Sequence, residues 1–211
     1  MKTTGAKATK TAAGDTPPVK PGAGLGTRER IVRAASHLMQ RQGYDGTGIK
    51  QISVEASATL GSVYHFFPGG KQELAVAAIG HGEQEFAHEL ERWLAAETDP
   101  AAAVVACAHH LAVGLRDSDW VDGCPVTSTA LGTAGRAPDI QEAAARAFAR
   151  WRELVAARLR AAGFAEDVAT ELAYTVISTL EGAELAAQVE RSTTPLEVAG
   201  RHLARLIDLY R

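Results

Sequence analysis

The chain has 211 residues, of which 46% are hydrophobic, and this length and composition suit one or two small globular domains. No apolar run approaches the length of a membrane span and the N-terminus lacks the apolar core of a signal peptide, so we expect a cytoplasmic protein. The two cysteines, Cys107 and Cys124, form no CxxC pair and do not indicate a disulfide framework.

The net charge of −3 is unevenly distributed along the chain. Up to residue 72 there are ten Lys and Arg against four Asp and Glu, a net charge of +6, whereas the remainder has twelve against twenty-one, a net charge of −9. Every lysine lies at or before Lys71. This asymmetry indicates a partner of opposite charge for the basic part, and nucleic-acid phosphate is the obvious one.

Residues 1–26 are rich in Lys, Thr, Ala, Gly and Pro, and this composition predicts a disordered basic tail. Two interpretations of the tail are open: it adds nonspecific affinity for DNA, or it is inert. A first helix is expected after the N-cap Thr27, and Gly43 suits the position that ends it.

Residues 47–71 read as two short helices joined by a tight turn. In the first helix Ile49, Ile52 and Ala56 recur at helical spacing and form an apolar stripe. The small residues at 56–58 allow a sharp turn, and Thr59 is a good N-cap for the second helix. This arrangement is typical of a helix-turn-helix, whose second helix enters the major groove of DNA.

The second short helix has distinct inner and outer faces. Val63 and Phe67 lie four residues apart and can face the core, and Pro68 with the two following glycines ends the helix. The side chains predicted to point outward are those of Leu60, Ser62, Tyr64 and His65.

The rest of the chain shows helical periodicity and helix-start signals without any strand alternation. We expect helices over residues 71–97, from Asp99-Pro100 to 116, a short one after Pro125, then 138–163, 166–190, and a last one opened by a capping box at 194–197. The fold class is therefore all-α with about nine helices. The division we expect is the tail at 1–26, a helix-turn-helix domain at 27–72, and a second helical domain at 73–211.

From Thr27 to about Ile79 the sequence resembles the DNA-binding domain of the tetracycline-repressor (TetR) family of transcriptional regulators. The resemblance rests on Ile-Val-Arg-Ala-Ala-Ser-His-Leu-Met, Gly43-Tyr44, Thr47, the Gly-Ser-Val-Tyr-His-Phe-Phe run at 61–67, and Lys71. Thr-Gly at 47–48 and Phe-Pro-Gly-Gly-Lys at 67–71 look like the LmrA/YxaF-type branch, as does Trp120 followed by Gly-Cys-Pro at 123–125.

The resemblance implies a set of DNA contacts. Phosphates would be contacted by Thr47, Tyr64, His65 and Lys71, and base edges would face Leu60, Gly61 and Ser62. Thr59, the N-cap of the same helix, is also counted among the expected DNA-binding residues. The family often has Lys, Arg or Pro where Leu60 stands, so we expect Leu60 to meet a thymine methyl or no base at all.

The resemblance also implies a homodimer formed by the last two long helices, at 166–190 and 195–210, and a small hydrophobic or aromatic effector. Candidate effector-binding side chains in the second domain are Phe86, Trp93, His110, Phe148 and Trp151. Ordinary core packing is the competing interpretation of these aromatic residues. The expected function is a repressor that binds a palindromic operator and is released by its effector. The alternative is a DNA-binding regulator without an effector.

Other chemistry finds less support in the sequence. His81, Glu85 and His88 lie one helical turn apart, but a solvated helix face explains them better than a metal site, as it does His109 and His110. No glycine-rich phosphate loop, nucleophile elbow or HExxH motif is present, so we expect neither an enzyme nor a cofactor. Cys124, at a possible helix start, is either a redox-sensing thiol with a depressed pKa or a structural one, whereas no role is predicted for Cys107.

Overall fold

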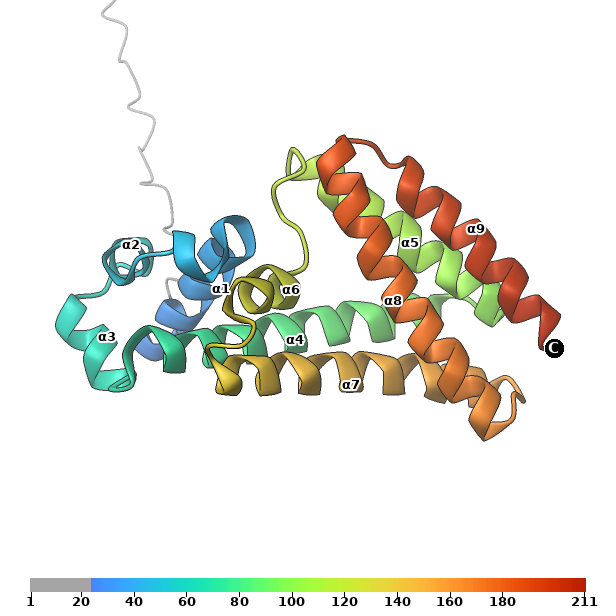
Figure 1. Ribbon diagram of the computed structural model, residues 1–211, viewed down its shortest axis with the longest axis horizontal. Helices are drawn as coiled ribbons and strands as arrows, with labels where there is room; N and C mark the ends of the chain where they lie inside the picture. The colour runs from blue at the N-terminus through green and yellow to red at the C-terminus, as the bar shows by residue number, and fades with distance from the viewer. Residues whose placement is uncertain (1–23) are drawn as a thin grey trace, which may run out of the picture.

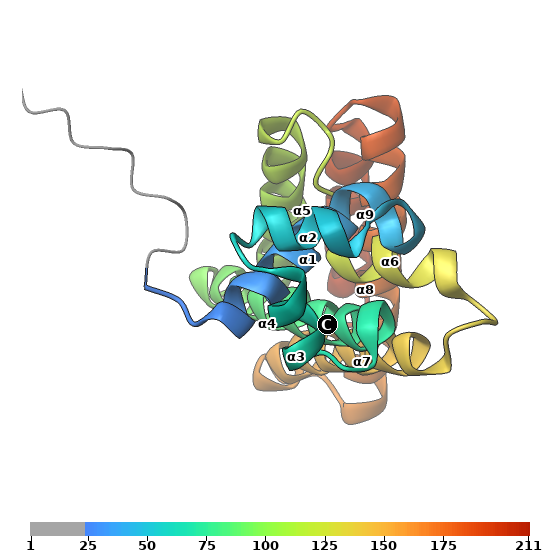
Figure 2. The ribbon, with the colours of Figure 1, turned by 90° about the vertical axis from the view of Figure 1, so that its left-hand side faces the viewer.

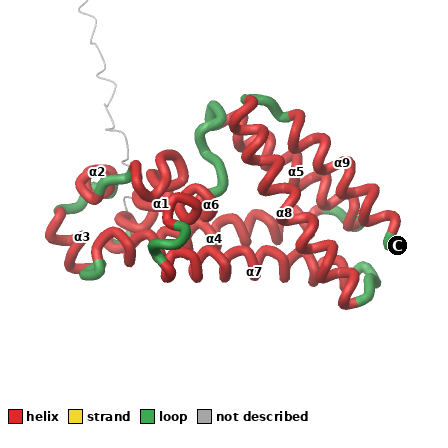
Figure 3. Tube along the Cα trace, in the orientation of Figure 1, coloured by secondary structure: helices red, strands yellow, loops and turns green. Residues whose placement is uncertain are grey.

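The computed structural model describes residues 24–211, which form helices joined by short connections and contain no strand (Figures 1 and 3). The elements are α1 (Thr27–Gly46), α2 (Ile49–Glu55), α3 (Leu60–Phe66), α4 (Gly70–Ala96), α5 (Pro100–Asp117), α6 (Pro125–Ala130), the 3-10 turn η1 (Leu131–Thr133), α7 (Pro138–Ala161), α8 (Glu166–Glu190) and α9 (Thr194–Leu209). The prediction of an all-α fold with about nine helices is confirmed for this part of the chain. The predicted disorder of residues 1–23 lies outside the described residues.

Local signals in the sequence set most of the helix boundaries. The Asp99 carboxylate accepts a hydrogen bond of 3.2 Å from the Ala102 amide and caps α5, whose first residue is Pro100. Gly163, at φ 95°, follows the end of α7, because a left-handed residue stops the helical ladder at little cost when it has no Cβ.

Two predicted boundaries differ from the structure. The N-cap of α1 is Gly26 rather than Thr27, and Gly43 interrupts α1 at φ 69° instead of ending it, so that one further turn extends to Gly46. The last helix is preceded by Thr193, whose hydroxyl bonds the Glu197 side chain at 2.7 Å. The capping box expected from Thr194 is therefore absent, since the N-cap Thr193 forms no side-chain hydrogen bond with the first amides of α9.

The helices pack in two groups that share α4. At one end α1, α2 and α3 lie together, and α1 packs on both α4 and α6. At the other end α5, α8 and α9 pack together, while α7 lies beside α4 and also contacts α8 (Figure 1). The long helix α4 thus runs from the tip that carries α3 into the body of the larger group.

Candidate functional site

The helix α3 lies at one tip of the molecule and exposes one of its faces (Figures 1 and 2). Val63 and Phe67 are buried, as predicted, whereas the side chain of Tyr64 is 53% exposed and that of Leu60 is 37% exposed. Gly61 and His65 lie on the exposed side as well. The outward face therefore combines a phenol, an imidazole and a position without a side chain.

The turn before α3 is held by local hydrogen bonds. The Thr59 hydroxyl accepts a hydrogen bond of 3.0 Å from the Ser62 amide, which confirms Thr59 as the N-cap, and lies 2.9 Å from the Ser62 hydroxyl. Ser57 adopts a left-handed conformation at φ 49°, so the chain reverses within the three small residues between α2 and α3. The orientation of α3 relative to α2 is thus set by main-chain geometry and by one cap.

The lack of a side chain at Gly61 is not required by the packing of this chain. A Cβ atom added there would meet only the Thr59 hydroxyl oxygen, at 3.7 Å, which is an ordinary van der Waals contact. The missing side chain of Gly61 therefore leaves space on the outer surface of the protein and not in its interior.

The predicted phosphate contacts differ in their surroundings. The Lys71 ammonium lies 4.4 Å from the centroid of the Tyr44 ring, and burial lowers the pKa of this lysine. Thr47 is fully buried, and its hydroxyl donates a hydrogen bond of 2.8 Å to the Gly43 carbonyl. In this conformation Thr47 stabilises the turn between α1 and α2 and presents no donor at the surface.

Several basic side chains near α3 are already engaged. Arg30 donates to the carbonyls of Ala56 and Leu25, at 3.1 and 3.0 Å. The guanidinium group of Arg28 lies over the Phe67 ring, 5.2 Å from its centroid. Arg28 and Arg30 therefore contribute packing and main-chain contacts as well as positive charge.

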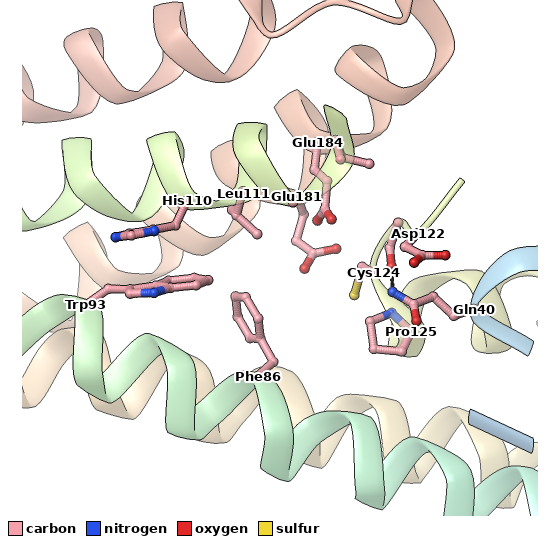
Figure 4. A pocket seen from close by; sticks show the side chains of 13 residues that line it. Gln40, Phe86, Trp93, His110, Leu111, Asp122, Cys124, Pro125, Glu181 and Glu184 are labelled. Atoms are coloured by element: carbon pink, nitrogen blue, oxygen red, sulfur yellow. Dashed lines mark hydrogen bonds between the residues drawn. The ribbon is translucent and has the colours of Figure 1, made fainter. Parts of the chain in front are cut away.

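A second candidate site is a hollow among α1, α4, α5, α8 and the segment before α6 (Figure 4). It encloses about 590 Å³ of empty space, including the part that is open to solvent. We call it the pocket, and its lining residues are Gln40, Phe86, Trp93, His110, Leu111, Gly114, Leu115, Asp122, Gly123, Cys124, Pro125, Glu181 and Glu184.

One end of the pocket is aromatic. The His110 and Trp93 rings are stacked, with centroids 5.0 Å apart and planes inclined by 8°. Phe86 meets Trp93 edge-on, at a centroid distance of 6.0 Å. These are three of the five predicted effector-binding side chains.

The other two predicted effector-binding side chains do not line the pocket. Trp151 is fully buried and donates a hydrogen bond of 3.3 Å from its indole nitrogen to the Glu83 carbonyl. Phe148 packs edge-on against Trp151, and Trp151 packs edge-on against Phe86. They belong to the packing between α4 and α7, so core packing is the right interpretation of these two residues.

The other end of the pocket is acidic, which the sequence analysis missed. Glu181 and Glu184 project into it from α8 (Figure 4), and the Glu181 carboxylate accepts a hydrogen bond of 2.7 Å from the Thr127 hydroxyl. Burial raises the pKa of Glu181, and burial together with the nearby Glu181 charge raises the pKa of Glu184 to about 8. A signal was available: Glu184 continues the buried stripe of Ile177, Leu180 and Ala187, where an acidic residue is out of place.

Cys124 lies at this acidic end and caps α6, its sulfur accepting a hydrogen bond of 3.4 Å from the Thr127 amide. Burial, reinforced by the charges of Glu181 and Glu184, raises the pKa of its thiol well above the ordinary value. The depressed pKa expected for a redox-sensing thiol at Cys124 is therefore wrong, because desolvation outweighs the hydrogen bonds with Thr127, and the structural interpretation of this thiol is favoured. Burial likewise raises the pKa of Cys107 to about 12.

Within residues 24–211, no three His, Cys, Asp or Glu side chains are grouped closely enough to hold a metal ion. His81 instead pairs with Glu85, at 3.3 Å between Nε2 and the carboxylate. Over the same residues, no helix combines the length and the apolar character that crossing a membrane requires.

An exposed recognition helix after a tight turn, joined to a larger helical body, defines the class of helix-turn-helix transcriptional regulators. Residues 31–78 match the family described as bacterial regulatory proteins, tetR family, and residues 100–202 match the C-terminal domain described as transcriptional regulator LmrA/YxaF-like. The chain belongs to the TetR family, in its LmrA/YxaF-like branch, and is a DNA-binding regulator rather than an enzyme.

Individual relatives agree with this assignment. The HTH-type transcriptional regulator LmrA of Bacillus subtilis (strain 168) is 34% identical over 81% of this chain and 90% of its own. A TetR transcriptional regulator from Chloroflexus aurantiacus J-10-FL has a similar crystal structure, with a TM-score of 0.71 at 30% identity over 86% of this chain and 94% of that one. The TetR-family regulator CifR, solved with a 26-bp operator DNA, has the same fold, with a TM-score of 0.72 at 18% identity over 84% of this chain and 94% of that one.

Proposed function

We propose that this protein is a repressor that binds a palindromic operator as a homodimer and is released by a small hydrophobic or aromatic effector. Residues 27–72 would bind DNA, and residues 73–211 would hold the effector and form the dimer. In this proposal Tyr64, His65 and Lys71 contact phosphates, and Leu60, Gly61 and Ser62 face base edges, as members of this family dock.

The observation that carries the proposal is the path of α4. This helix begins at Gly70, directly after the turn that ends α3, and supplies Phe86 and Trp93 to the pocket. At 1.5 Å per residue, Phe86 lies about 22 Å along the helix from Lys71. A ligand that tilts α4 at the pocket would therefore shift α3, and with it the separation of the two recognition helices in a dimer.

Exposed apolar side chains on α8 and α9 support the dimer. Half of the large hydrophobic residues exposed among residues 24–211 lie on or directly after these two helices, namely Tyr174, Leu185, Val189, Val198, Leu209 and Tyr210. Apolar surface of this kind is typical of a protein–protein contact. A second copy presenting the same two helices would complete a four-helix bundle with two-fold symmetry.

The two-fold symmetry of the proposed dimer determines the spacing of the half-sites in the operator. Two recognition helices related by a two-fold axis read half-sites in successive major grooves, about 34–36 Å apart for one helical turn. The footprint should be palindromic, and affinity should fall steeply as salt rises, since bound counterions return to the DNA. A footprint without dyad symmetry from a monomeric protein would contradict the proposal.

Linkage gives the experiment that tests the effector role. If an effector lowers operator affinity about a hundredfold, it must prefer the DNA-incompetent state by about 2.7 kcal/mol, and operator DNA must weaken effector binding by the same factor. The experiment is a titration of flat aromatic compounds against the protein with and without operator. Equal ligand affinity in the two conditions favours the alternative function, a DNA-binding regulator without an effector.

A further inference from the structure

The acidic end of the pocket holds a carboxyl group without a partner. Glu184 is only 8% exposed, and no side chain among residues 24–211 forms a hydrogen bond with it. Glu181, one helical turn away, has the Thr127 hydroxyl as its partner. Figure 4 shows both carboxyl groups directed into the space between α8 and the Phe86 ring. Two acidic groups facing one cavity are costly to ionise together, because each raises the energy of the other's charge.

No permanent positive charge in the pocket offsets these carboxyl groups. The lining includes neither lysine nor arginine, and α4 contributes only aromatic rings there. Asp122, the third acidic side chain of the lining, forms its own ion pair with Arg41 from α1. His110 on α5 is the one basic group of the lining, and its ring is stacked on Trp93 at the other end.

We infer that the pocket takes an organic cation with a flat aromatic body. Its positively charged nitrogen would lie between the Glu181 and Glu184 carboxylates, and its ring system would pack against Phe86 and Trp93. Aromatic faces attract cations, and a buried carboxylate without a partner gains most from an opposite charge. The inference rests on the proposed function, since it assigns a chemical class to the effector of that site.

A proton exchange accompanies this binding. Because burial and the Glu181 charge hold the pKa of Glu184 near 8 in the free protein, its carboxyl group is largely protonated at neutral pH. The entering cation stabilises the carboxylate, so the proton leaves to solvent as the ligand binds. Affinity for the cation should therefore rise with pH up to about 8 and then level off.

Other titratable groups line the pocket or adjoin its wall, and their effects have to be distinguished from that of Glu184. They are Glu181 on its own helix, Cys124 and Asp122 in the segment before α6, His110 on α5, and Arg41 on α1 paired with Asp122. A positive charge on His110 would also oppose a bound cation. The pH dependence should therefore persist in His110→Gln and disappear in Glu184→Gln.

The experiment compares 9-aminoacridine, a cation at neutral pH, with acridine, which has the same ring system and is neutral there. Binding to the full chain is measured by calorimetry in two buffers of different ionisation heat, which also counts the released protons. We expect the cation to bind at least about tenfold tighter, a difference of about 1.4 kcal/mol, with proton release. Glu184→Gln should abolish both the preference and the release, whereas Glu171→Gln, at an exposed position of the same helix, should change neither.

Failure of the inference is distinguishable from failure of the proposed function. Equal or tighter binding of acridine, binding of neither dye, or an unchanged preference in Glu184→Gln overturns the inference of a cation. If acridine releases the operator and 9-aminoacridine does not, the pocket is still an effector site, but the inference that its ligand is a cation is contradicted. Tight, proton-linked binding of 9-aminoacridine without any change in operator affinity would support the inferred charge and contradict the effector role.

Discussion

The Gln40 side-chain amide donates a hydrogen bond of 2.6 Å to the main-chain carbonyl of Gly123. Gln40 belongs to α1, next to the helix-turn-helix, and Gly123 belongs to the segment that lines the pocket. Beside this bond, Arg41 pairs with Asp122, so the end of α1 is joined to the pocket wall twice. The pocket is therefore connected to the DNA-reading end of the molecule through α1 as well as through α4.

The first prediction concerns this connection. An effector weakens operator binding by some factor, and Gln40→Ala should make that factor about fivefold smaller, which corresponds to about 1 kcal/mol. The reason is that a ligand-induced movement of Gly123 would no longer be transmitted to α1 through this hydrogen bond. The measurement is operator affinity with and without saturating effector. Gln42→Ala, at an exposed position of the same helix, is the control. An unchanged factor in Gln40→Ala would show that the hydrogen bond between Gln40 and Gly123 does not carry the coupling.

The second prediction concerns Gly61. A methyl group there fits the folded protein, so Gly61→Ala should leave the free energy of unfolding unchanged or raise it by up to about 1 kcal/mol. Operator affinity should nevertheless fall at least about tenfold, since the methyl group occupies the space that a base edge or phosphate would approach. Gly80→Ala, on α4 with nothing within 4 Å of the added atom, should leave operator affinity unaltered. Full operator affinity of Gly61→Ala would remove Gly61 from the DNA contact.

The third prediction separates positioning from readout in α3 and at the start of α4. Lys71→Ala should weaken binding to all DNA sequences alike and lower the slope of log affinity against log salt by about one, because one phosphate contact is lost. Ser62→Ala should act mainly on the cognate operator. Gel-shift titrations at several salt concentrations, on operator and on random DNA, distinguish the two effects. A changed sequence preference with an unchanged salt slope in Lys71→Ala would reverse the roles.

The fourth prediction concerns stability and pH. The pKa of Glu184 is about 8 in the folded protein and 4.5 as the ordinary value, so protonation favours the folded state. The free energy of unfolding should therefore receive a contribution from Glu184 that is full below pH 4.5 and is lost as the pH rises to about 8. Glu184→Gln should remove this dependence and be the more stable protein at pH 8, by a few kcal/mol on the order of the pKa difference.

Urea unfolding of the wild type and Glu184→Gln across this pH range, at one protein concentration, checks the fourth prediction. Since the other carboxyl groups are common to both proteins, the difference between the two curves isolates Glu184. A difference that stays constant between pH 4.5 and 8 would contradict the assigned burial of the Glu184 carboxyl group.

The sequence by itself predicts the helices and the helix-turn-helix. Prolines at first helical turns, the caps Asp99 and Thr59, and glycines at helix ends act within a few residues, so they can be recognised without the fold. The inward positions of Val63 and Phe67 follow from helical period in the same way. The family resemblance, carried by residues 27–79, is confirmed as well.

Only the tertiary structure decides which side chains meet at the pocket. Helical period shows that Trp93 and Trp151 both face inward, yet the packing of α4 on α7 buries Trp151 and leaves Trp93 at the cavity. The same packing brings Glu184 opposite Phe86, although nearly a hundred residues separate them in the chain. Local signals define the face of each helix, but the helices that oppose that face depend on how all of them cross and pack, which is a property of the whole chain.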